Sequence, residues 1–529
     1  MSKAIRMAKL SAKGGLSLFL GVSLSTIISA VGIFIVARLL TADEYGLYTI
    51  TFISPSLISL FRDWGINSAM IKHLAQYRTE NRIKEIKNVL TSSLLFESAL
   101  GILLSVISFS LAGFLATNVF HRPPETKLYF MIEIASILIL TESLLITSQS
   151  TFIGFERMEF NSLTMIVQSC LKTFLAPILV FLGYSTLGAV LGHTIAVLIA
   201  STLAIIIFYF AFYRKIRGSE NDGSKLSGTL KTMLRYGLPL SVSTILTGFL
   251  LQFYNFMMAI YCSDFMIGNY SVAVNFAVLI TFFTTPIATV LFPAFSKLDL
   301  EKDVETLRVI FQSSVKYAAI LTVPATAAIM VLSKPLVSTL FGEKYSYAPL
   351  FLTMYAISYL YSGLGNLSLG NFLNGQGKTK VTMMLTLITL GIGLPLSLTL
   401  IPAFGITGLI VTTLVAGVPS LAVGLWWVKK HFDITVNWVA SAKIFLASAI
   451  AAVVTHVIVF QLSLQNWVNL VIGGIIFLTT YLIVAPLIRA VNKSDITNLK
   501  EMLSDLGPFS YLFDLPLNVI EKLLTIFTS

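Results

Sequence analysis

The chain has 529 residues, of which 56% are hydrophobic and only 12% are charged. This composition excludes an ordinary soluble domain, in which about a quarter of the residues are charged. The formal net charge of +11 would suggest nucleic acid as a partner of a soluble protein, but in so apolar a chain it indicates basic segments at a membrane surface, and we predict no nucleic-acid partner.

Apolar runs long enough to cross a membrane recur along the whole chain. A helix needs roughly 20 apolar residues to cross a hydrocarbon core of about 30 Å. The runs predict an all-α, polytopic membrane protein with fourteen transmembrane helices. They begin near Gly15, Tyr45, Asn88, Leu128, Leu163, Leu187, Tyr236, Met266, Tyr317, Leu350, Thr379, Ile406, Val439 and Val468.

Basic residues gather in every second connection between these helices. Most of the 36 Lys and Arg residues lie in the two tails and in the even-numbered connections, which predicts that both termini face the cytoplasm. The predicted location is therefore the cytoplasmic membrane. The odd-numbered connections hold only Arg38, Arg122, Lys127, Lys334 and Lys344.

Short glycine-containing motifs recur at an almost constant offset along the chain. Six predicted helices separate the members of each pair, so the repeats keep the same orientation in the membrane. This pattern predicts two six-helix bundles related by internal duplication, with coincidence between short turn motifs as the alternative. The paired segments are 46–48 with 268–270, 154–157 with 375–378, and 188–189 with 408–409.

The duplication divides the chain into five parts. The polar sequence Gly218 to Ser224 lies between the bundles and is typical of a flexible linker. The predicted parts are an N-terminal six-helix bundle (1–213), a cytoplasmic linker (214–235), a C-terminal six-helix bundle (236–430), helices 13 and 14 (431–490), and a cytoplasmic or interfacial tail (491–529).

Several local motifs resemble one family over nearly the whole chain. They include Arg38-Leu39-Leu40, the stretch 44–48, Asp63-Trp64-Gly65, Tyr236-Gly237-Leu238-Pro239, Leu291-Phe292-Pro293 and the stretch 340–345. Together they are similar to the flippases for lipid-linked oligosaccharides and polysaccharide units, which belong to the multidrug/oligosaccharidyl-lipid/polysaccharide exporter superfamily. The sequence departs from this family at Asn255, where an acidic residue is frequent.

The resemblance implies a function and a set of partners. It implies a flippase that moves a polyprenyl- or dolichyl-linked oligosaccharide or polysaccharide repeat unit across the membrane by alternating access between two bundles. The implied partners are the polyprenyl- or dolichyl-(di)phosphate-linked glycan, membrane lipids and enzymes of glycan assembly.

Ionisable residues inside the first-half helices are the candidate site. A charge at the centre of a membrane helix costs ~2.5–3.5 kcal/mol on insertion scales, so it normally faces a cavity or a partner. Arg62 and Lys172 are predicted to bind the phosphate oxygens of a lipid-linked head group. Asp63, Glu97 and Glu142 are predicted to couple transport to H⁺ or Na⁺, and no other cofactor and no metal is predicted.

The second half holds no comparably deep charge in this interpretation. Asn255 and Asn275 are its predicted polar cavity residues. Prolines inside the predicted helices suggest hinges or local unwinding. These are Pro177 in the first half and Pro239, Pro286, Pro324 and Pro395 in the second.

Three alternatives remain open at this stage. The buried charges could be structural pairs, Arg62 with Asp63 or Glu97 and Lys172 with Glu142. The protein could be an ion-coupled multidrug or cation antiporter of the same superfamily. A membrane glycosyltransferase or polymerase is the third alternative, but the longest external connection (117–127) lacks the paired acids of glycosyl chemistry, and we predict a non-enzyme.

Overall fold

The computed structural model describes residues 3–216, 224–299, 302–461 and 464–504, together with positions 518, 521, 522 and 524. The regular elements in these residues are all helical. The chain divides into two compact units, 1–268 and 269–529. The all-α prediction is therefore confirmed for the described residues.

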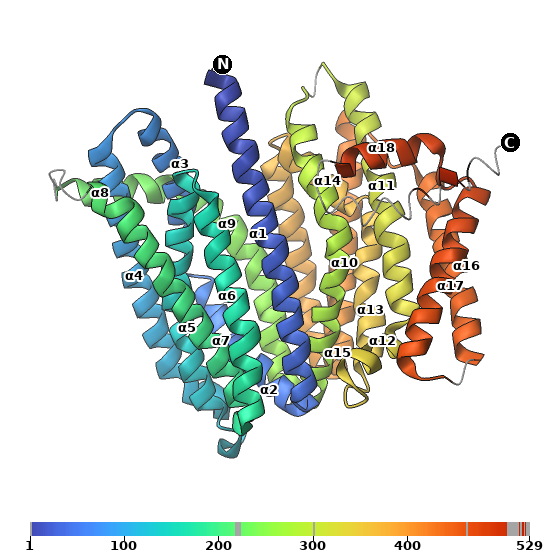
Figure 1. Cartoon of the computed structure of the whole chain (residues 1–529), viewed down its shortest axis with the longest axis horizontal. Helices are drawn as coiled ribbons and strands as arrows, with labels where there is room; N and C mark the ends of the chain where they lie inside the picture. The colour runs from blue at the N-terminus through green and yellow to red at the C-terminus, as the bar shows by residue number, and fades with distance from the viewer. Residues whose placement is uncertain are drawn as a thin grey trace. The chain divides into compact units, whose positions relative to one another are not determined.

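The N-terminal unit is a bundle of long helices that lie side by side (Figure 1). In this unit α6 packs against both α1 and α7, and α5 packs against α4 and α7. Short π or 3₁₀ segments, η1 to η4, follow or precede several of these helices. The helices are α1 (Lys3–Leu39), α2 (Ala42–Ser59), α3 (Ile66–Thr79), α4 (Ile83–Phe114), α5 (Leu128–Gly154), α6 (Met158–Leu179), α7 (Ser185–Ile207), α8 (Arg214–Ile216) and α9 (Ser224–Tyr261).

Helix α9 belongs to the N-terminal unit, where it packs against α2, α3 and α4. Its first turns include residues 224–235, which the sequence assigned to the linker. Residues 217–223 lie outside the described residues. The predicted boundaries of the two six-helix bundles, at residues 213 and 235, stay a prediction. The compact units of the structure divide at a different point, after Gly268.

The C-terminal unit is organised around α11, which packs against α13, α14 and α16. Helices α16 and α17 pack along each other, and α12 packs against α17. Helix α10 (Asp264–Ser296) begins in the last residues of the N-terminal unit. The other elements are α11 (Val304–Val331), α12 (Ser333–Phe341), α13 (Ala348–Leu360), η5 (Tyr361–Leu364), α14 (Asn366–Gly375), α15 (Thr379–Phe432), α16 (Trp438–Gln461), α17 (Asn466–Leu487) and α18 (Lys493–Ser504).

Local sequence explains where α2 begins. Thr41 is its N-cap, and its side chain accepts a hydrogen bond from the backbone N–H of Glu44. The Glu44 carboxylate in turn accepts from the backbone N–H of Thr41 at 2.7 Å. This reciprocal capping box satisfies two donors that the first helical turn leaves without partners. Glu44 also accepts a hydrogen bond from Ser185, which ties the start of α2 to the start of α7.

Ten stretches of the described residues are long and apolar enough to cross a membrane. Two of them are too long for one crossing, since 59 residues (Met158–Ile216) and 54 residues (Thr379–Phe432) of helix at 1.5 Å per residue far exceed a core of about 30 Å. Each contains a break, at Gly183 (φ 92°) and at Gly405 (φ 58°). The protein is therefore a multi-pass membrane protein.

Two further helices are interrupted at glycine rather than at proline. Gly65 (φ 78°) separates α2 from α3, and Gly365 (φ 100°) separates η5 from α14. Helices α6, α9, α11 and α15 continue through their internal prolines. Glycine occupies both of these positions because it adopts positive φ values without strain.

Candidate functional site

The site lies in the N-terminal unit, where the chain between α2 and α3 leaves the helical path. The Asp63 carboxylate accepts a hydrogen bond from the backbone N–H of Gly65 at 2.8 Å. Gly65 also packs directly on the backbone of Gly237, since a Cβ built on Gly65 would lie 2.1 Å from the Gly237 carbonyl oxygen. This turn fixes Arg62 at the interruption, where its side chain is buried.

Arg62 forms a loose ion pair with Glu142 of α5. The distance from Nη1 to the Glu142 Oε2 is 3.5 Å, and the exposed fractions of the two side chains are 10% and 39%. The Nε atom of Arg62 is buried and has no hydrogen-bond partner among the described residues, and Nη1 makes only the 3.5 Å contact with Glu142. A guanidinium carries five donors in a planar fork, so Arg62 retains donors that an anion can occupy.

Glu97 of α4 is held tightly beside this pair. It is 0% exposed, and its two carboxylate oxygens accept hydrogen bonds from Asn67 at 3.0 Å and from Ser143 at 2.7 Å. Ser143 is the neighbour of Glu142 on α5. Arg62 and Asp63 both act electrostatically on Glu97. The three predicted acids and Arg62 therefore belong to one network that joins α3, α4 and α5.

Lys172 approaches the same network from α6. It is half-buried, and its charge acts on both Glu142 and His193. Two cations, Arg62 and Lys172, therefore act electrostatically on Glu142. In a low-dielectric interior such charges interact much more strongly than in water.

A small polar cavity of about 100 Å³ opens beside Glu142. Ser56 and Ser59 of α2 and His193 of α7 also line it. The His193 Nδ1 lies 3.1 Å from the Tyr48 hydroxyl, and its ring packs on Phe52 with centroids 4.7 Å apart. The space and the polar groups suit a few water molecules or a small cation.

Sequence reasoning named neither His193 nor the two serines as site residues. Ser56 and Ser59 are three positions apart, a spacing that places both on one face of a helix. This spacing was the only pattern from which the sequence could have predicted a polar helix face there. His193 is a single polar residue in an apolar run, and only its contact with Tyr48 reveals where it lies.

The two predicted amides of the second half fall in different units. Asn255 lies on α9 in the N-terminal unit, half-buried, with its Nδ2 at 3.5 Å from the Gln252 Oε1. Asn275 lies on α10 in the C-terminal unit and is also half-buried. Their role as cavity residues of one lobe stays a prediction.

The fold defines the class of protein, a polytopic helical membrane protein with several ionisable side chains in its interior. The sequence matches the family described as polysaccharide biosynthesis protein over residues 11–299, more than half of its length. The chain belongs to this family. Residues 239–399 also match the family described as MatE.

Curated relatives agree with this assignment. The chain is 26% identical over 353 residues to the lipopolysaccharide biosynthesis protein WzxC of Escherichia coli (strain K12), a match that spans 66% of each protein. It is 21% identical over 251 residues to a protein of Haloferax volcanii named "Probable low-salt glycan biosynthesis flippase Agl15", covering 46% of this chain and 53% of that one.

A solved structure shares the fold. The lipid II flippase MurJ in an inward closed conformation superposes with a TM-score of 0.71 at 16% identity, covering 89% of this chain and 98% of MurJ. The resemblance predicted from the motifs is therefore confirmed. The protein is a multi-pass membrane protein of the polysaccharide biosynthesis family, it shares the fold of a lipid flippase, and one of its named relatives is described as a probable flippase.

Proposed function

We propose that this protein translocates a polyprenyl- or dolichyl-linked oligosaccharide or polysaccharide repeat unit across the cytoplasmic membrane by alternating access. The observation that carries the proposal is the buried Arg62, which retains unpartnered donors at an interrupted helix in a chain of this family. A glycan linked to a lipid through phosphate needs such donors, because guanidinium groups bind phosphate oxygens with charge-assisted hydrogen bonds.

The interrupted helix itself supports a binding role for this region. In many transporters, discontinuous helices form the substrate site near the middle of the membrane. Arg62 and Asp63 lie in the interruption between α2 and α3, and Lys172 adds a second cation. The lipid-linked phosphate would contact Arg62 and Lys172, while the lipid tail stays in the bilayer.

Exchange of partners gives the site a route to ion coupling. When a substrate phosphate takes the donors of Arg62, Glu142 loses its paired cation, and a carboxylate without a partner in this setting gains affinity for H⁺ or Na⁺. Release of the phosphate would restore the Arg62–Glu142 pair and expel the ion. Glu97 and Asp63 would tune this exchange through their charges on the same network.

Fourteen crossings and an internal duplication are part of the proposal. Splitting the 59- and 54-residue stretches at their breaks, and adding the interrupted pairs α2–α3 and α13–α14, raises ten stretches to fourteen crossings. Backbone geometry supports the repeat, because Ser185 (φ 48°, ψ −134°) and Gly405 (φ 58°, ψ −132°) share an unusual conformation 220 positions apart. Glu156 and Gly377, 221 positions apart, both have positive φ values, 57° and 65°.

We place both termini in the cytoplasm, on the evidence of the basic residues in the even-numbered connections. Glycan assembly enzymes on that side would supply the lipid-linked unit. Net transport would follow the coupling ion or removal of the product on the far side.

An ion-coupled cation or drug antiporter is the second candidate. The MatE match over residues 239–399 favours it. Its substrate would be a cation, which Glu142 and Glu97 would bind without the help of Arg62 or Lys172.

Transport in proteoliposomes tests the proposal. A fluorescent lipid-linked oligosaccharide is supplied to one leaflet, and its appearance in the other is compared for the intact chain, Arg62→Ala and Lys172→Ala. Arg157→Ala is the matched control, since the Arg157 side chain is 51% exposed and pairs with Glu159 at the protein surface. We expect both site variants to lose transport and the control to keep it.

Two results would contradict this function. Full transport by folded Arg62→Ala and Lys172→Ala would make these cations structural pairs. An intact chain that moves no lipid-linked sugar but exchanges an organic cation for H⁺ or Na⁺ would be an antiporter.

A further inference from the structure

Helix α9 runs antiparallel to α2 and meets it closely at both ends. Near the start of α9, a Cβ built on Gly237 would lie 2.4 Å from the carbonyl oxygen of Gly65, just beyond the end of α2. At the other end, where α9 gives way to α10, a Cβ built on Gly46 of α2 would lie 1.9 Å from the carbonyl oxygen of Asp264. Backbones in such contact leave no room for a side chain, which is why glycine occupies these positions.

The crossing at the start of α10 is reciprocal. A Cβ built on Gly268 would lie 1.9 Å from the carbonyl oxygen of Ala42, the same distance that separates a Cβ on Gly46 from the carbonyl oxygen of Asp264. Gly46 and Gly268 are 222 positions apart, and so are Ala42 and Asp264. Each glycine therefore packs on the residue four positions before the other one. Two equivalent segments that cross about a local two-fold axis produce this pattern.

This crossing joins parts of the chain that the proposed mechanism moves apart. Helix α2 and the connection between α4 and α5 belong to the predicted N-terminal six-helix bundle (1–213). Helix α9 from residue 236 and the start of α10 belong to the predicted C-terminal bundle (236–430), although they lie in the N-terminal compact unit. Alternating access requires contacts between two such bundles to break at one end while they hold at the other.

Arg122, in the connection between α4 and α5, ties the end of α9 to this crossing. Its Nε donates to the Asp264 Oδ1 at 2.7 Å, and its Nη2 donates to the carbonyl oxygen of Cys262 at 2.8 Å. Only 11% of the Arg122 side chain and 18% of that of Asp264 are exposed. The same connection packs the fully buried Phe120 against Phe256 of α9, with ring centroids 5.5 Å apart. Charged and apolar contacts thus hold this end closed together.

A second acid makes the closed state depend on Arg122. Asp43 of α2 acts electrostatically on Asp264, and the two carboxylates carry the same charge. Arg122 offsets their repulsion while its ion pair with Asp264 is formed. Without the guanidinium the repulsion is uncompensated, and like charges in a partly buried setting favour separation.

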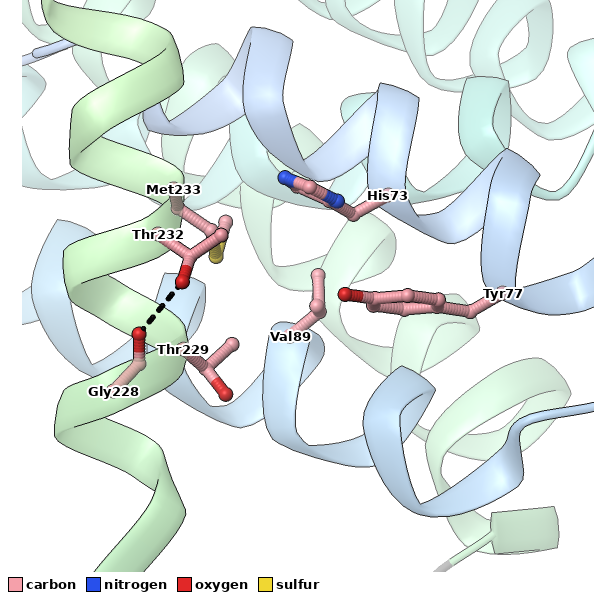
Figure 2. A pocket seen from close by; sticks show the side chains of 7 residues that line it. All are labelled: His73, Tyr77, Val89, Gly228, Thr229, Thr232 and Met233. Atoms are coloured by element: carbon pink, nitrogen blue, oxygen red, sulfur yellow. Dashed lines mark hydrogen bonds between the residues drawn. The ribbon is translucent and has the colours of Figure 1, made fainter.

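The contact at the start of α9 is held less firmly. A pocket of about 320 Å³ lies beside it, with Met233 of α9 on one side and His73 and Tyr77 of α3 on the other (Figure 2). Met233 itself is buried. An ion pair therefore closes one end of α9, whereas an open space lies between the helices at the other.

We propose that Arg122 and Asp264 form a lock that holds the crossing of α2 with the start of α10 closed, and that this lock opens once in each transport cycle. The inference rests on the alternating access proposed above. Its test needs no lipid-linked sugar. An intact chain that moves no such sugar would contradict the flippase function, while the lock would be decided by its own result.

Labelling of a native thiol reports on the lock. Cys262 is 7% exposed and its carbonyl oxygen accepts from Arg122, so opening of the crossing exposes it. The full chain carries Cys170→Ser, which removes the other cysteine, and its labelling by a membrane-impermeant maleimide is followed in nanodiscs. We expect Arg122→Gln to raise the labelling rate roughly tenfold or more. Arg157→Gln is the matched control, since the Arg157 side chain is 51% exposed and pairs with Glu159 at the surface.

A thiol at the other end of α9 distinguishes a lock from a connection that merely loosens. Gly237→Ala forces the contact with Gly65 apart, and in this background Met233→Cys supplies a thiol beside the pocket, with both native cysteines replaced by serine. Opening at the start of α10 closes this end if the helices rock as one body. We therefore expect Arg122→Gln to slow the labelling of Met233→Cys. A loosened connection leaves that rate unchanged.

A second lock variant decides the outcome if Arg122→Gln does not fold, as judged by its Tm. Asp264→Asn removes the negative charge and leaves the hydrogen bond from Arg122 to the carbonyl oxygen of Cys262 in place. The proposal is overturned if Cys262 is labelled equally fast in the intact chain and in the folded lock variants. Faster labelling of Cys262 without slower labelling of Met233→Cys also overturns it.

Discussion

Each unit contains an ion pair in its interior that joins two helices or a helix and a turn, and the pairs Lys316–Asp495 and Arg62–Glu142 are built differently. In the C-terminal unit, the Lys316 ammonium of α11 lies 2.5 Å from the Asp495 carboxylate of α18, with side chains only 17% and 9% exposed. In the N-terminal unit, Arg62 and Glu142 are 3.5 Å apart, Glu142 is 39% exposed, and Arg62 keeps unpartnered donors beside a cavity. We call the Lys316–Asp495 pair closed, because it holds two elements together. We call the Arg62–Glu142 pair open, because it can exchange its partner.

Satisfied polar groups occur in both units, since the N-terminal unit also holds the close ion pair Arg122–Asp264 at 2.7 Å. In the C-terminal unit, the fully buried Asn269 accepts hydrogen bonds from the backbone N–H groups of Tyr347 and Ala348, both at 2.9 Å. A neutral amide whose oxygen already accepts two hydrogen bonds needs no further ligand at that atom. The comparison favours a structural role for the Lys316–Asp495 pair and supports the proposal that Arg62 and Glu142 exchange partners during transport.

The largest loss of stability is expected when the ion pair between Lys316 and Asp495 is broken. Asp495→Ala leaves the Lys316 charge buried and alone, which costs about 3–5 kcal/mol. We expect a large drop in the Tm of the full chain, measured in nanodiscs by intrinsic fluorescence. The double variant Lys316→Met/Asp495→Leu should recover most of this loss and retain transport.

The exposed pair Arg308–Asp433 provides the control. Its Asp433 side chain is 80% exposed, so Arg308→Ala should cost no more than about 1 kcal/mol. Loss of transport in the stable double variant Lys316→Met/Asp495→Leu would refute a purely structural role for the closed pair.

A smaller loss of stability but a complete loss of transport is expected at the open pair. Arg62→Met leaves Glu142 without its cation, and because Glu142 is partly exposed we expect a cost of about 1–3 kcal/mol. Arg62→Met/Glu142→Leu should regain stability without regaining transport of a lipid-linked oligosaccharide. Recovery of transport together with stability would make this pair a scaffold too.

The interrupted helix of the C-terminal unit gives a still smaller effect. Gly365 has a φ of 100°, and a Cβ there would lie 3.2 Å from the Val436 side chain. Gly365→Ala should cost about 1–2 kcal/mol through backbone strain. Gly370→Ala is the control, since Gly370 lies inside α14 with no atom within 4 Å of its Cβ, and it should be neutral or stabilising. Equal Tm values for the two variants would exclude strain at Gly365.

The smallest effects are expected at exposed acids, one in each unit. Hydrogen bonds from Gln76 and then Arg82 lower the pKa of Glu80, and a hydrogen bond from Lys500 lowers that of Glu521. A lowered pKa adds stability above the unfolded value and loses it as pH falls through the folded value. Glu80→Gln and Glu521→Gln should therefore lower Tm slightly at neutral pH, by about a degree or less, and not at all in strong acid. A difference that grows in acid would contradict the sign.

Local patterns in the sequence were sufficient for the class of protein. Apolar runs of about 20 residues can only be membrane helices in a chain this poor in charge, and the motifs around Glu44 and Asp63 identified the family. The same patterns singled out Arg62, Glu97, Glu142 and Lys172, because a charge in an apolar run is costly wherever the fold places it.

The sequence could not predict which of these side chains contact one another in the fold. Arg62 was expected to pair with Asp63 or Glu97 if its role were structural, yet its ion pair is with Glu142, because Asp63 caps the turn at Gly65 and Glu97 is occupied by Asn67 and Ser143. These contacts join residues far apart in the chain, and no local period encodes them.

The tertiary structure also decided which charged side chains are buried. The predicted span near this point begins at Tyr317, which leaves Lys316 in a connection, but Lys316 lies within α11 and is covered by its pair with Asp495 of α18. Helix interruptions follow the same rule, since the chain breaks at Gly65 and Gly365 while helices pass through Pro239 and Pro324. The sequence by itself determined that the chain crosses a membrane several times, because that depends on each segment's own transfer free energy. Only the tertiary structure decided which side chains meet, because that depends on how the helices pack.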